Sequence, residues 1–300
     1  MATYTETFSG QTTGSNSTTF TDRYDAESFV SVENPSLGEQ DSRVLQFGSS
    51  DSGFIFQSFD SVDADANRDN CEILARYRLA SDAGGQSLAI ARASGSGGSE
   101  TCYAAYVKDD DFTISRFDSG TESVISSTPT GSYPSSSYVF GGGDDFASEP
   151  TGIWVWVRFR VNGTGATVTL QGKWWKDGFD EPENWIIDTT DTTGSRITTA
   201  GWVGFGKQDF TGNTYLDFFG VGTNSDTAPL PASDTSNTLR VTNVHGQVLY
   251  SGGPARVTNV HGQVLYSGGP VRVTNTYVQV LYETPATVSA GHTVVAMISC

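Results

Sequence analysis

The chain has 300 residues with 34 acidic and 17 basic side chains, which gives a formal net charge of −17 at pH 7. This charge argues against a nucleic-acid-binding protein, which needs clustered Lys and Arg, and disfavours docking on anionic lipid. Its 34 Gly, 10 Pro and 12% aromatic residues are typical of an all-β globular protein with many turns. No apolar run approaches the roughly 20 residues of a membrane span, so we expect no membrane insertion. The first residues lack the basic and apolar segments of a signal peptide, so we expect folding in a cytoplasm.

Residues 1–225 contain short runs in which apolar and polar side chains alternate, separated by Gly, Ser, Asp and Asn. In the clearest run, residues 153–161, the odd positions are Ile, Val, Val, Phe and Val, and the even positions are Trp, Trp, Arg and Arg. This period of two predicts a strand with one core face and a second face open to solvent or to another sheet. Asn162-Gly163 then predicts a hairpin turn, and residues 166–175 the return strand.

Similar runs predict seven further strands, namely Glu72–Leu79, Ser87–Ala93, Cys102–Lys108, Phe112–Asp118, Glu122–Ser127, Gly201–Gly206 and Thr214–Val221. At least nine strands at hairpin spacing, without a strong helix signal, predict an antiparallel jelly-roll β-sandwich over residues 1–225.

Three cysteines, Cys71, Cys102 and Cys300, are too few for a disulfide framework. Cys71 and Cys102 lie beside two predicted strands and could face each other. A reducing site of synthesis favours the alternative that the thiols are buried and free.

Residues 226–239 are predicted to be a linker, because Pro229 and Pro231 keep the chain extended and outside regular structure. A β-repeat tail follows over residues 240–300 and has a period of 16. Arg240–Pro254 recurs unchanged as Arg256–Pro270, and a diverged third copy runs from Arg272 to Tyr282.

Each repeat predicts an eleven-residue β-strand with two mixed faces, which cannot form a core alone and would bury surface against neighbouring chains. Among the positions that keep the same residue in all copies, three are the candidate assembly contacts: Asn243, Asn259 and Asn275; Gln247, Gln263 and Gln279; Tyr250, Tyr266 and Tyr282. His245 and His261 also share a register, but the third copy has Tyr277 there, and one His per strand supplies too few ligands for zinc.

Several segments resemble a concanavalin-like, laminin-G-like jelly roll: Gln86–Gly95, Tyr103, Phe112–Arg116, Trp156–Val161, Lys173–Trp175, Glu181-Pro182, Trp185, Ala200–Gly206 and Tyr215–Val221. That family includes carbohydrate-binding modules, glucanases, adhesion domains and phage structural proteins, so the resemblance by itself gives only an expectation about function. The Arg-Val-Thr-Asn…Val-Leu-Tyr repeats resemble those at the ends of tailed-bacteriophage virion proteins, where they often follow a laminin-G-like domain.

Sugar recognition requires exposed aromatic rings on which a pyranose face can stack. The candidate glycan contacts are Trp174, Trp175, Trp185, Tyr133 and Tyr138. Trp174 and Trp175 are neighbours on a strand and must point to opposite faces, so we expect one in the core and the other as a platform. The alternative is that all six tryptophans serve packing.

The resemblance also implies a structural Ca²⁺ with Asp217 as a ligand, near the meeting of the first and last strands. Asp60, Asp63 and Asp65 form a second group of carboxylates. Neither group supplies the six to eight oxygens that calcium requires, and solvated acidic loops are the alternative. No other cofactor is expected.

The sequence contains little that indicates a catalytic site. A glucanase of this fold needs two carboxylates alternating on one strand, and no predicted strand carries them. Glu181 and Glu183 flank Pro182 in a loop, which we interpret as a solvated turn. All three histidines lie in the C-terminal segment. We therefore expect that the protein is not an enzyme.

These features together predict a non-catalytic bacteriophage virion structural protein, associated with tail or capsid and made in the host cytoplasm. Its jelly-roll head would be displayed on the particle and its repeat tail anchored in the assembly. Its partners would be other copies of itself, other virion proteins and host-surface glycans. The alternative is a carbohydrate-binding module or a polysaccharide-active enzyme of the concanavalin-like fold.

Overall fold

A computed structural model describes residues 2–24, 30–33, 43–48, 54–79, 86–108, 111–129, 154–177, 181–208 and 213–231, with the backbone of 241–242 and 248–250. The chain divides into two compact units, Met1–Pro231 and Ala232–Cys300. Among the described residues, no helix has the length and apolar character needed to cross a membrane.

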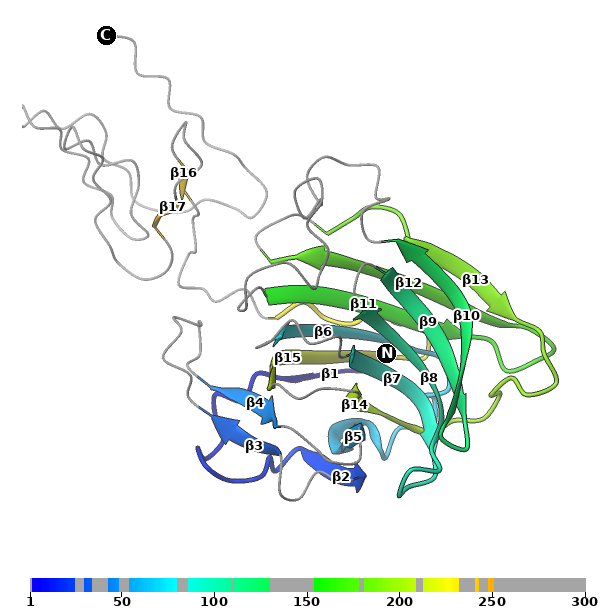
Figure 1. Ribbon diagram of the computed structural model, residues 1–300, viewed down its shortest axis with the longest axis horizontal. Coiled ribbons are helices and arrows are strands. Elements are labelled where there is room, and N and C mark those ends of the chain that lie inside the picture. The colour runs from blue at the N-terminus through cyan, green and yellow to red at the C-terminus, as the bar shows by residue number, and fades with distance from the viewer. Residues whose placement is uncertain are drawn as a thin grey trace, which may run out of the picture. The chain divides into compact units, whose positions relative to one another are not determined.

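The first unit is a sandwich of two antiparallel sheets (Figure 1). The eight-stranded sheet contains β1 (Ala2–Glu6), β3 (Val30–Glu33), β4 (Val44–Phe47), β6 (Cys71–Leu79), β11 (Trp154–Asn162), β12 (Val168–Lys176), β13 (Ile187–Asp191) and β15 (Thr214–Thr223). Its order is β13-β12-β11-β6-β15-β4-β3, with β1 also paired to β15. This architecture confirms the predicted all-β sandwich.

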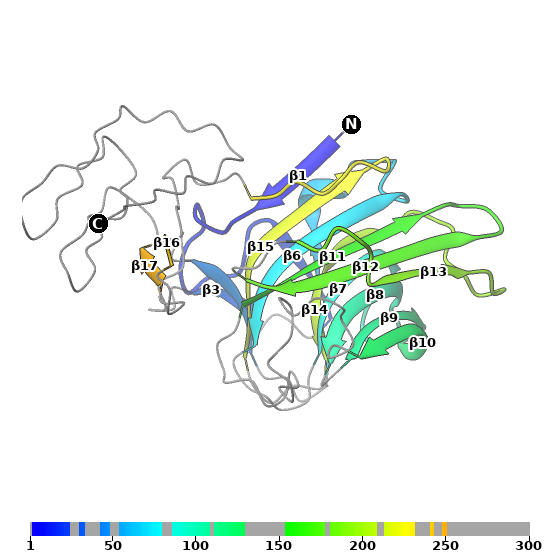
Figure 2. The same cartoon turned by 90° about the horizontal axis from the view of Figure 1, so that it is seen from above.

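The second sheet has seven strands and forms the other layer (Figure 2). Its members are β2 (Phe20–Tyr24), β5 (Phe54–Phe59), β7 (Gln86–Ser94), β8 (Thr101–Lys108), β9 (Asp111–Asp118), β10 (Thr121–Pro129) and β14 (Trp202–Gln208), and the 3-10 helix η1 (Asp60–Val62) follows β5. The order is β10-β9-β8-β7-β14-β5-β2. The chain passes repeatedly between the layers, so β6 lies between β11 and β15, which are distant in sequence.

All nine predicted strands are present. Six further strands, β1 to β5 and β13, were not predicted, and each has four to six residues. Such short strands contain too few alternating residues to show a clear period.

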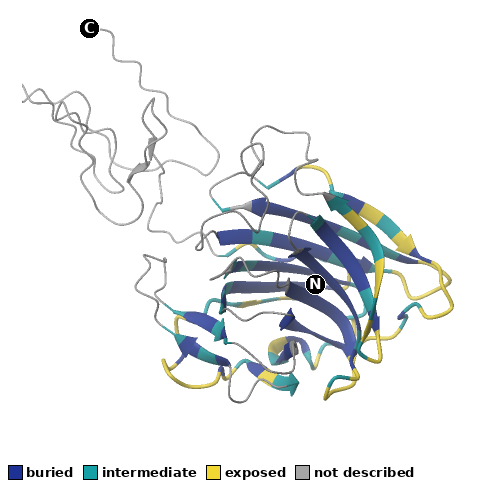
Figure 3. Ribbon diagram, viewed as in Figure 1, coloured by how far each residue is buried: buried dark blue, intermediate teal, exposed yellow. Residues whose placement is uncertain are grey.

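The main core lies between the two sheets, where the strands are most deeply buried (Figure 3). The odd positions of β11 belong to it, as the alternation predicted: Val155, Val157, Phe159 and Val161 are all fully buried. A second apolar cluster, which includes Leu88, Ile90 and Ala104, lies on the other face of the seven-stranded sheet.

The hairpin turn between β11 and β12 forms as predicted. Gly163 has φ +90°, and a Cβ there would lie 2.7 Å from the carbonyl oxygen of Thr167. A residue with a side chain would be strained at this position, so the turn requires glycine.

Cys71 and Cys102 are free and buried, which decides between the two alternatives. They belong to different apolar clusters, Cys71 to the inter-sheet core and Cys102 to the second cluster. Burial raises the pKa of the Cys71 thiol to about 12 and that of Cys102 well above its ordinary value. Both therefore behave as small apolar side chains.

The described part of the second unit is one pair of short strands, β16 (Val241–Thr242) and β17 (Val248–Tyr250), which are antiparallel. These two strands lie within the first repeat, whose other residues are outside the described part of the chain, so the strand predicted over the whole repeat stays a prediction. Of the candidate assembly contacts, Tyr250 lies in β17 and the other eight lie outside the described residues.

Candidate functional site

Three basic side chains lie together on the outer face of the eight-stranded sheet. The alternation of β11 turns its even positions, which include Arg158 and Arg160, away from the core. In the strand register, Arg158 is opposite Lys173 of β12, and Arg160 is opposite Glu72 of β6. Two like charges directly across a strand pair repel each other, so the Arg158–Lys173 pair needs a carboxylate between its members.

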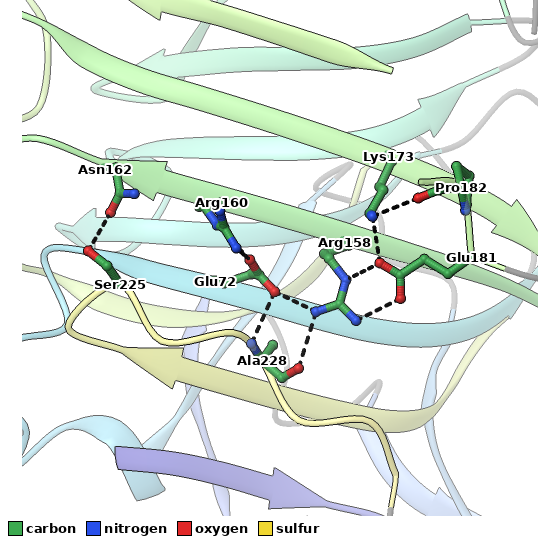
Figure 4. Close-up of polar contacts among 9 residues, drawn as sticks. All are labelled: Glu72, Arg158, Arg160, Asn162, Lys173, Glu181, Pro182, Ser225 and Ala228. Atoms are coloured by element: carbon green, nitrogen blue, oxygen red, sulfur yellow. Dashed lines mark hydrogen bonds and ion pairs between the residues drawn. The ribbon is translucent and has the colours of Figure 1, made fainter. Parts of the chain in front are cut away.

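Glu72 is fully buried beside the two arginines (Figure 4). Its carboxylate forms ion pairs with Arg158 and Arg160, and Arg160 Nε donates to Glu72 Oε2 at 2.6 Å. The backbone N–H of Ala228 donates to Glu72 Oε1 at 3.0 Å. A buried carboxylate is stable only when it is paired and hydrogen-bonded, and these partners meet that requirement.

Glu181 supplies the carboxylate that separates Arg158 from Lys173. Its Oε1 lies 2.7 Å from both Arg158 Nε and Lys173 Nζ, and its Oε2 accepts a hydrogen bond from Arg158 Nη2 at 2.9 Å. Partial burial would raise the pKa of Glu181, but the hydrogen bonds and charges of Arg158 and Lys173 outweigh it and lower the pKa. The interpretation of Glu181 as part of a solvated turn is therefore wrong, while Glu183 is exposed as expected.

Residues 224–231, here called the cover segment, lie on the same sheet face. The carbonyl of Ala228 accepts a hydrogen bond from Arg158 Nη1 at 3.1 Å, in addition to the bond from its N–H to Glu72. Cβ atoms at Gly220 and Gly222 of β15 would lie 2.9 Å from Pro229 O and 2.4 Å from Asp226 O. These two glycines therefore permit the close approach of the cover segment, of which residues 226–231 were predicted to belong to the linker.

An open pocket of about 500 Å³ lies between the charged network and the cover segment. We call it the outer-face pocket; it is lined by Glu72, Arg158, Arg160, Lys173, Glu181, Trp185 and residues 227–230. The indole of Trp185 is half-buried, with its ring centroid 5.0 Å from the Arg160 guanidinium carbon and 4.9 Å from Lys173 Nζ. Cation–π contacts at these distances hold the ring in place. Trp185 is thus a predicted glycan contact that, among the described residues, lines this pocket.

The structure shows which faces the two adjacent tryptophans occupy and how far each is buried. Trp174 and Trp175 do belong to opposite faces, Trp174 in the inter-sheet core and Trp175 in a cluster with Ala228. Both are buried, at 2% and 4% exposure, so the expectation that one of them is an exposed platform is wrong. The reason is non-local, since Trp156 stacks on Trp175 with ring centroids 5.9 Å apart and the cover segment adds Ala228.

Asp217 pairs with a guanidinium rather than joining a set of acids. Its carboxylate forms an ion pair with Arg76, which also pairs with Asp177 at 2.9 Å. Among the described residues, no group of three or more His, Cys, Asp or Glu could hold a metal ion. An arginine at this carboxylate opposes a second cation, so the assignment of Asp217 as a calcium ligand is not supported.

The acidic run after β5 also has protein partners. Asp65 accepts hydrogen bonds from Tyr4 at 3.2 Å and from Thr223 at 2.5 Å, and Asp63 pairs with Arg23 at 3.5 Å. These contacts join the acids to β1, β2 and β15.

Most residues of the pocket were not predicted as site residues. The alternation of the strand placed Arg158 and Arg160 on the outer face without a role, and neither Glu72 nor Lys173 was a predicted site residue. The available signal was an excess of basic residues on one face of a predicted hairpin within a strongly acidic chain. Two other predicted glycan contacts, Tyr133 and Tyr138, lie outside the described residues.

No protein-family model and no curated protein sequence matches the chain. Similar solved structures include the carbohydrate-binding module CBM66 from Bacillus subtilis, at 14% identity over 69% of this chain and 96% of that one, with a TM-score of 0.42. A protein of unknown function from Shewanella oneidensis MR-1 is 9% identical over 76% of this chain and 89% of that one, with a TM-score of 0.47.

The metal-free form of lectin I-B4 from Griffonia simplicifolia is 10% identical over 75% of this chain and all of the lectin chain, with a TM-score of 0.40. Likeness at this level carries no function over to the chain, so the function has to be inferred from the outer-face pocket.

Proposed function

We propose that the first unit is a non-catalytic glycan-binding β-sandwich whose ligand occupies the outer-face pocket. The observation that carries this proposal is the half-buried indole of Trp185 in a pocket of about 500 Å³ that also holds fixed guanidinium and ammonium donors. An aromatic ring can stack on the apolar face of a sugar, while charged planar groups hydrogen-bond its hydroxyls. The alternative predicted from the sequence was a carbohydrate-binding module or a polysaccharide-active enzyme, and the pocket supports the binding module.

The charges in the pocket support a binding role rather than glycoside hydrolysis. A glycosidase needs one carboxylic acid that stays protonated because its pKa is raised. Glu181 has a lowered pKa and is held by Arg158 and Lys173. Glu72 is fully buried in ion pairs and cannot approach a glycosidic oxygen.

Binding of the full-length chain to immobilised neutral and acidic polysaccharides, with each hit quantified by calorimetry, tests this proposal. Trp185→Ala should weaken binding at least about tenfold, because burial of an aromatic face contributes roughly 1.5–3 kcal/mol and 1.4 kcal/mol corresponds to a factor of ten. Tyr215→Ala, which removes a half-buried ring that does not line the pocket, is the control and should bind normally. Equal affinity of the Trp185 variant and the unmodified chain would contradict the assignment.

We further propose that the repeats attach this sandwich to a virion assembly. The supporting observation is the unchanged recurrence of fifteen residues, because short β-repeats stabilise one another by stacking. The full-length chain should sediment as an oligomer and residues 1–231 as a monomer. Sedimentation of both as monomers would contradict the assembly role.

A further inference from the structure

We infer that the outer-face pocket selects glycans that carry a carboxylate, such as those built from uronic or sialic acid. This inference rests on the proposed glycan-binding function and names the class of sugar. The first observation is the charge of the lining residues: three cations, Arg158, Arg160 and Lys173, face two anions, Glu72 and Glu181. The lining of the pocket therefore carries one more positive than negative charge, within a protein of net charge −17.

Arg160 holds that surplus charge. Arg158 is 5% exposed and is surrounded by Glu72, Glu181 and the carbonyl of Ala228. Lys173 is 10% exposed and bonds to Glu181 and to the carbonyl of Pro182 at 2.8 Å. Arg160 is 26% exposed, and only its Nε and Nη2 are used, both by Glu72. Among the described residues, its Nη1 group has no hydrogen-bond acceptor, and a guanidinium with free N–H groups binds carboxylates strongly.

The surplus charge is also held in a fixed position. Arg160 is fixed on one side by the buried Glu72, which Arg158 and the Ala228 N–H hold in turn (Figure 4). On another side, its guanidinium carbon lies 5.0 Å from the ring of Trp185. A cation that is ordered before the ligand arrives loses little entropy on binding, so this arrangement favours affinity for an anion.

The neighbouring indole indicates a sugar rather than a bare anion. The ligand that fits both features has an apolar ring face for Trp185 and a carboxylate for Arg160, within a volume of about 500 Å³. Hexuronic and sialic acids both have this chemistry. A free phosphate or acetate would use Arg160 alone.

Matched ligand pairs test the inference on the full-length chain. The first pair is a galacturonic acid oligomer and its methyl ester, and the second is sialyllactose and lactose. We expect one acidic member to bind at least tenfold more tightly than its neutral counterpart at low salt, with the ratio falling as NaCl rises because screening weakens the ion pair. Arg160→Gln should bring the ratio of the affinity for the acidic sugar to that for its neutral counterpart close to one. Arg196→Gln, which removes an arginine that does not line the pocket, should leave the ratio unchanged.

Each outcome distinguishes the two proposals. Equal binding of the acidic and neutral members would overturn the acidic-sugar inference and leave glycan binding standing. If the unmodified chain bound no sugar, acidic or neutral, the proposed function itself would be overturned. Inorganic phosphate binding as tightly as the acidic sugars would show a simple anion site and would also overturn the inference. Circular dichroism and thermal unfolding show whether Arg160→Gln is folded. If that variant is unstable, Arg160→Lys is used in its place; it retains the positive charge and should keep part of the affinity ratio between acidic and neutral sugars.

Discussion

Substitution of Glu72 by Gln tests whether the charged network holds the sandwich together. The side chain of Glu72 is fully buried and its carboxylate has three donors: Arg158, Arg160 and the N–H of Ala228. Gln keeps the shape but removes the negative charge, so both arginines lose their ion pair with this residue. Removal of one partner from a buried ion pair costs about 3–5 kcal/mol.

The structure places the expected loss at the lower end of that range. Arg158 retains Glu181 as a partner, and Arg160 is 26% exposed and can reach water. We therefore expect Glu72→Gln to reduce the free energy of unfolding by about 3 kcal/mol. For a unit of this size, the melting temperature should fall by roughly 6–12 °C.

Urea unfolding followed by tryptophan fluorescence measures the free-energy change, and calorimetry measures the melting temperature. Glu183→Gln, in the exposed part of the same loop as Glu181, is the matched control and should change stability by less than about 0.5 kcal/mol. Hydrogen exchange adds a local measurement, because the Ala228 amide loses its charged acceptor and should exchange faster than amides in β8. A loss below about 1 kcal/mol, with unchanged exchange at Ala228, would refute the reasoning.

Three further outcomes are expected. Gly204→Ala places a Cβ 1.9 Å from Gln57 O and should destabilise the sandwich by about 1–3 kcal/mol in urea unfolding, whereas Gly194→Ala meets no atom within 4 Å and should not. The buried Cys71 thiol, whose pKa is raised to about 12, should resist alkylation at pH 8 until urea unfolds the chain, as peptide mass spectrometry will show; rapid labelling would contradict its burial. Because the pKa of Glu181 is lowered in the folded state, its ion pairs stabilise the fold fully at a pH above the ordinary carboxyl pKa of 4.5. That contribution is lost as the pH falls through the lower pKa of the folded state. The stability difference between the unmodified chain and Glu181→Gln should therefore shrink below pH 4.5, and a constant difference down to pH 3 would exclude this linkage.

The sequence by itself predicted an all-β sandwich, because the alternation of apolar and polar residues marks nine of its strands locally. Alternation in residues 153–161 assigned the core side of β11 correctly, and Asn162-Gly163 marked its turn. The same alternation placed Trp174 and Trp175 on opposite faces. These properties follow from the period of the strand, which any short stretch of sequence already contains.

Only the tertiary structure decided which outer-face residues form a pocket. β6 and β11 are about eighty residues apart in sequence, and their pairing brings Glu72 to Arg160. The cover segment follows β15 directly and packs Ala228 against Trp175, which is therefore buried instead of exposed. Glu181 looked like a solvated loop residue because neither of its partners, Arg158 and Lys173, is its neighbour in sequence. Burial and ion pairing depend on contacts between distant segments, and a local pattern does not contain them.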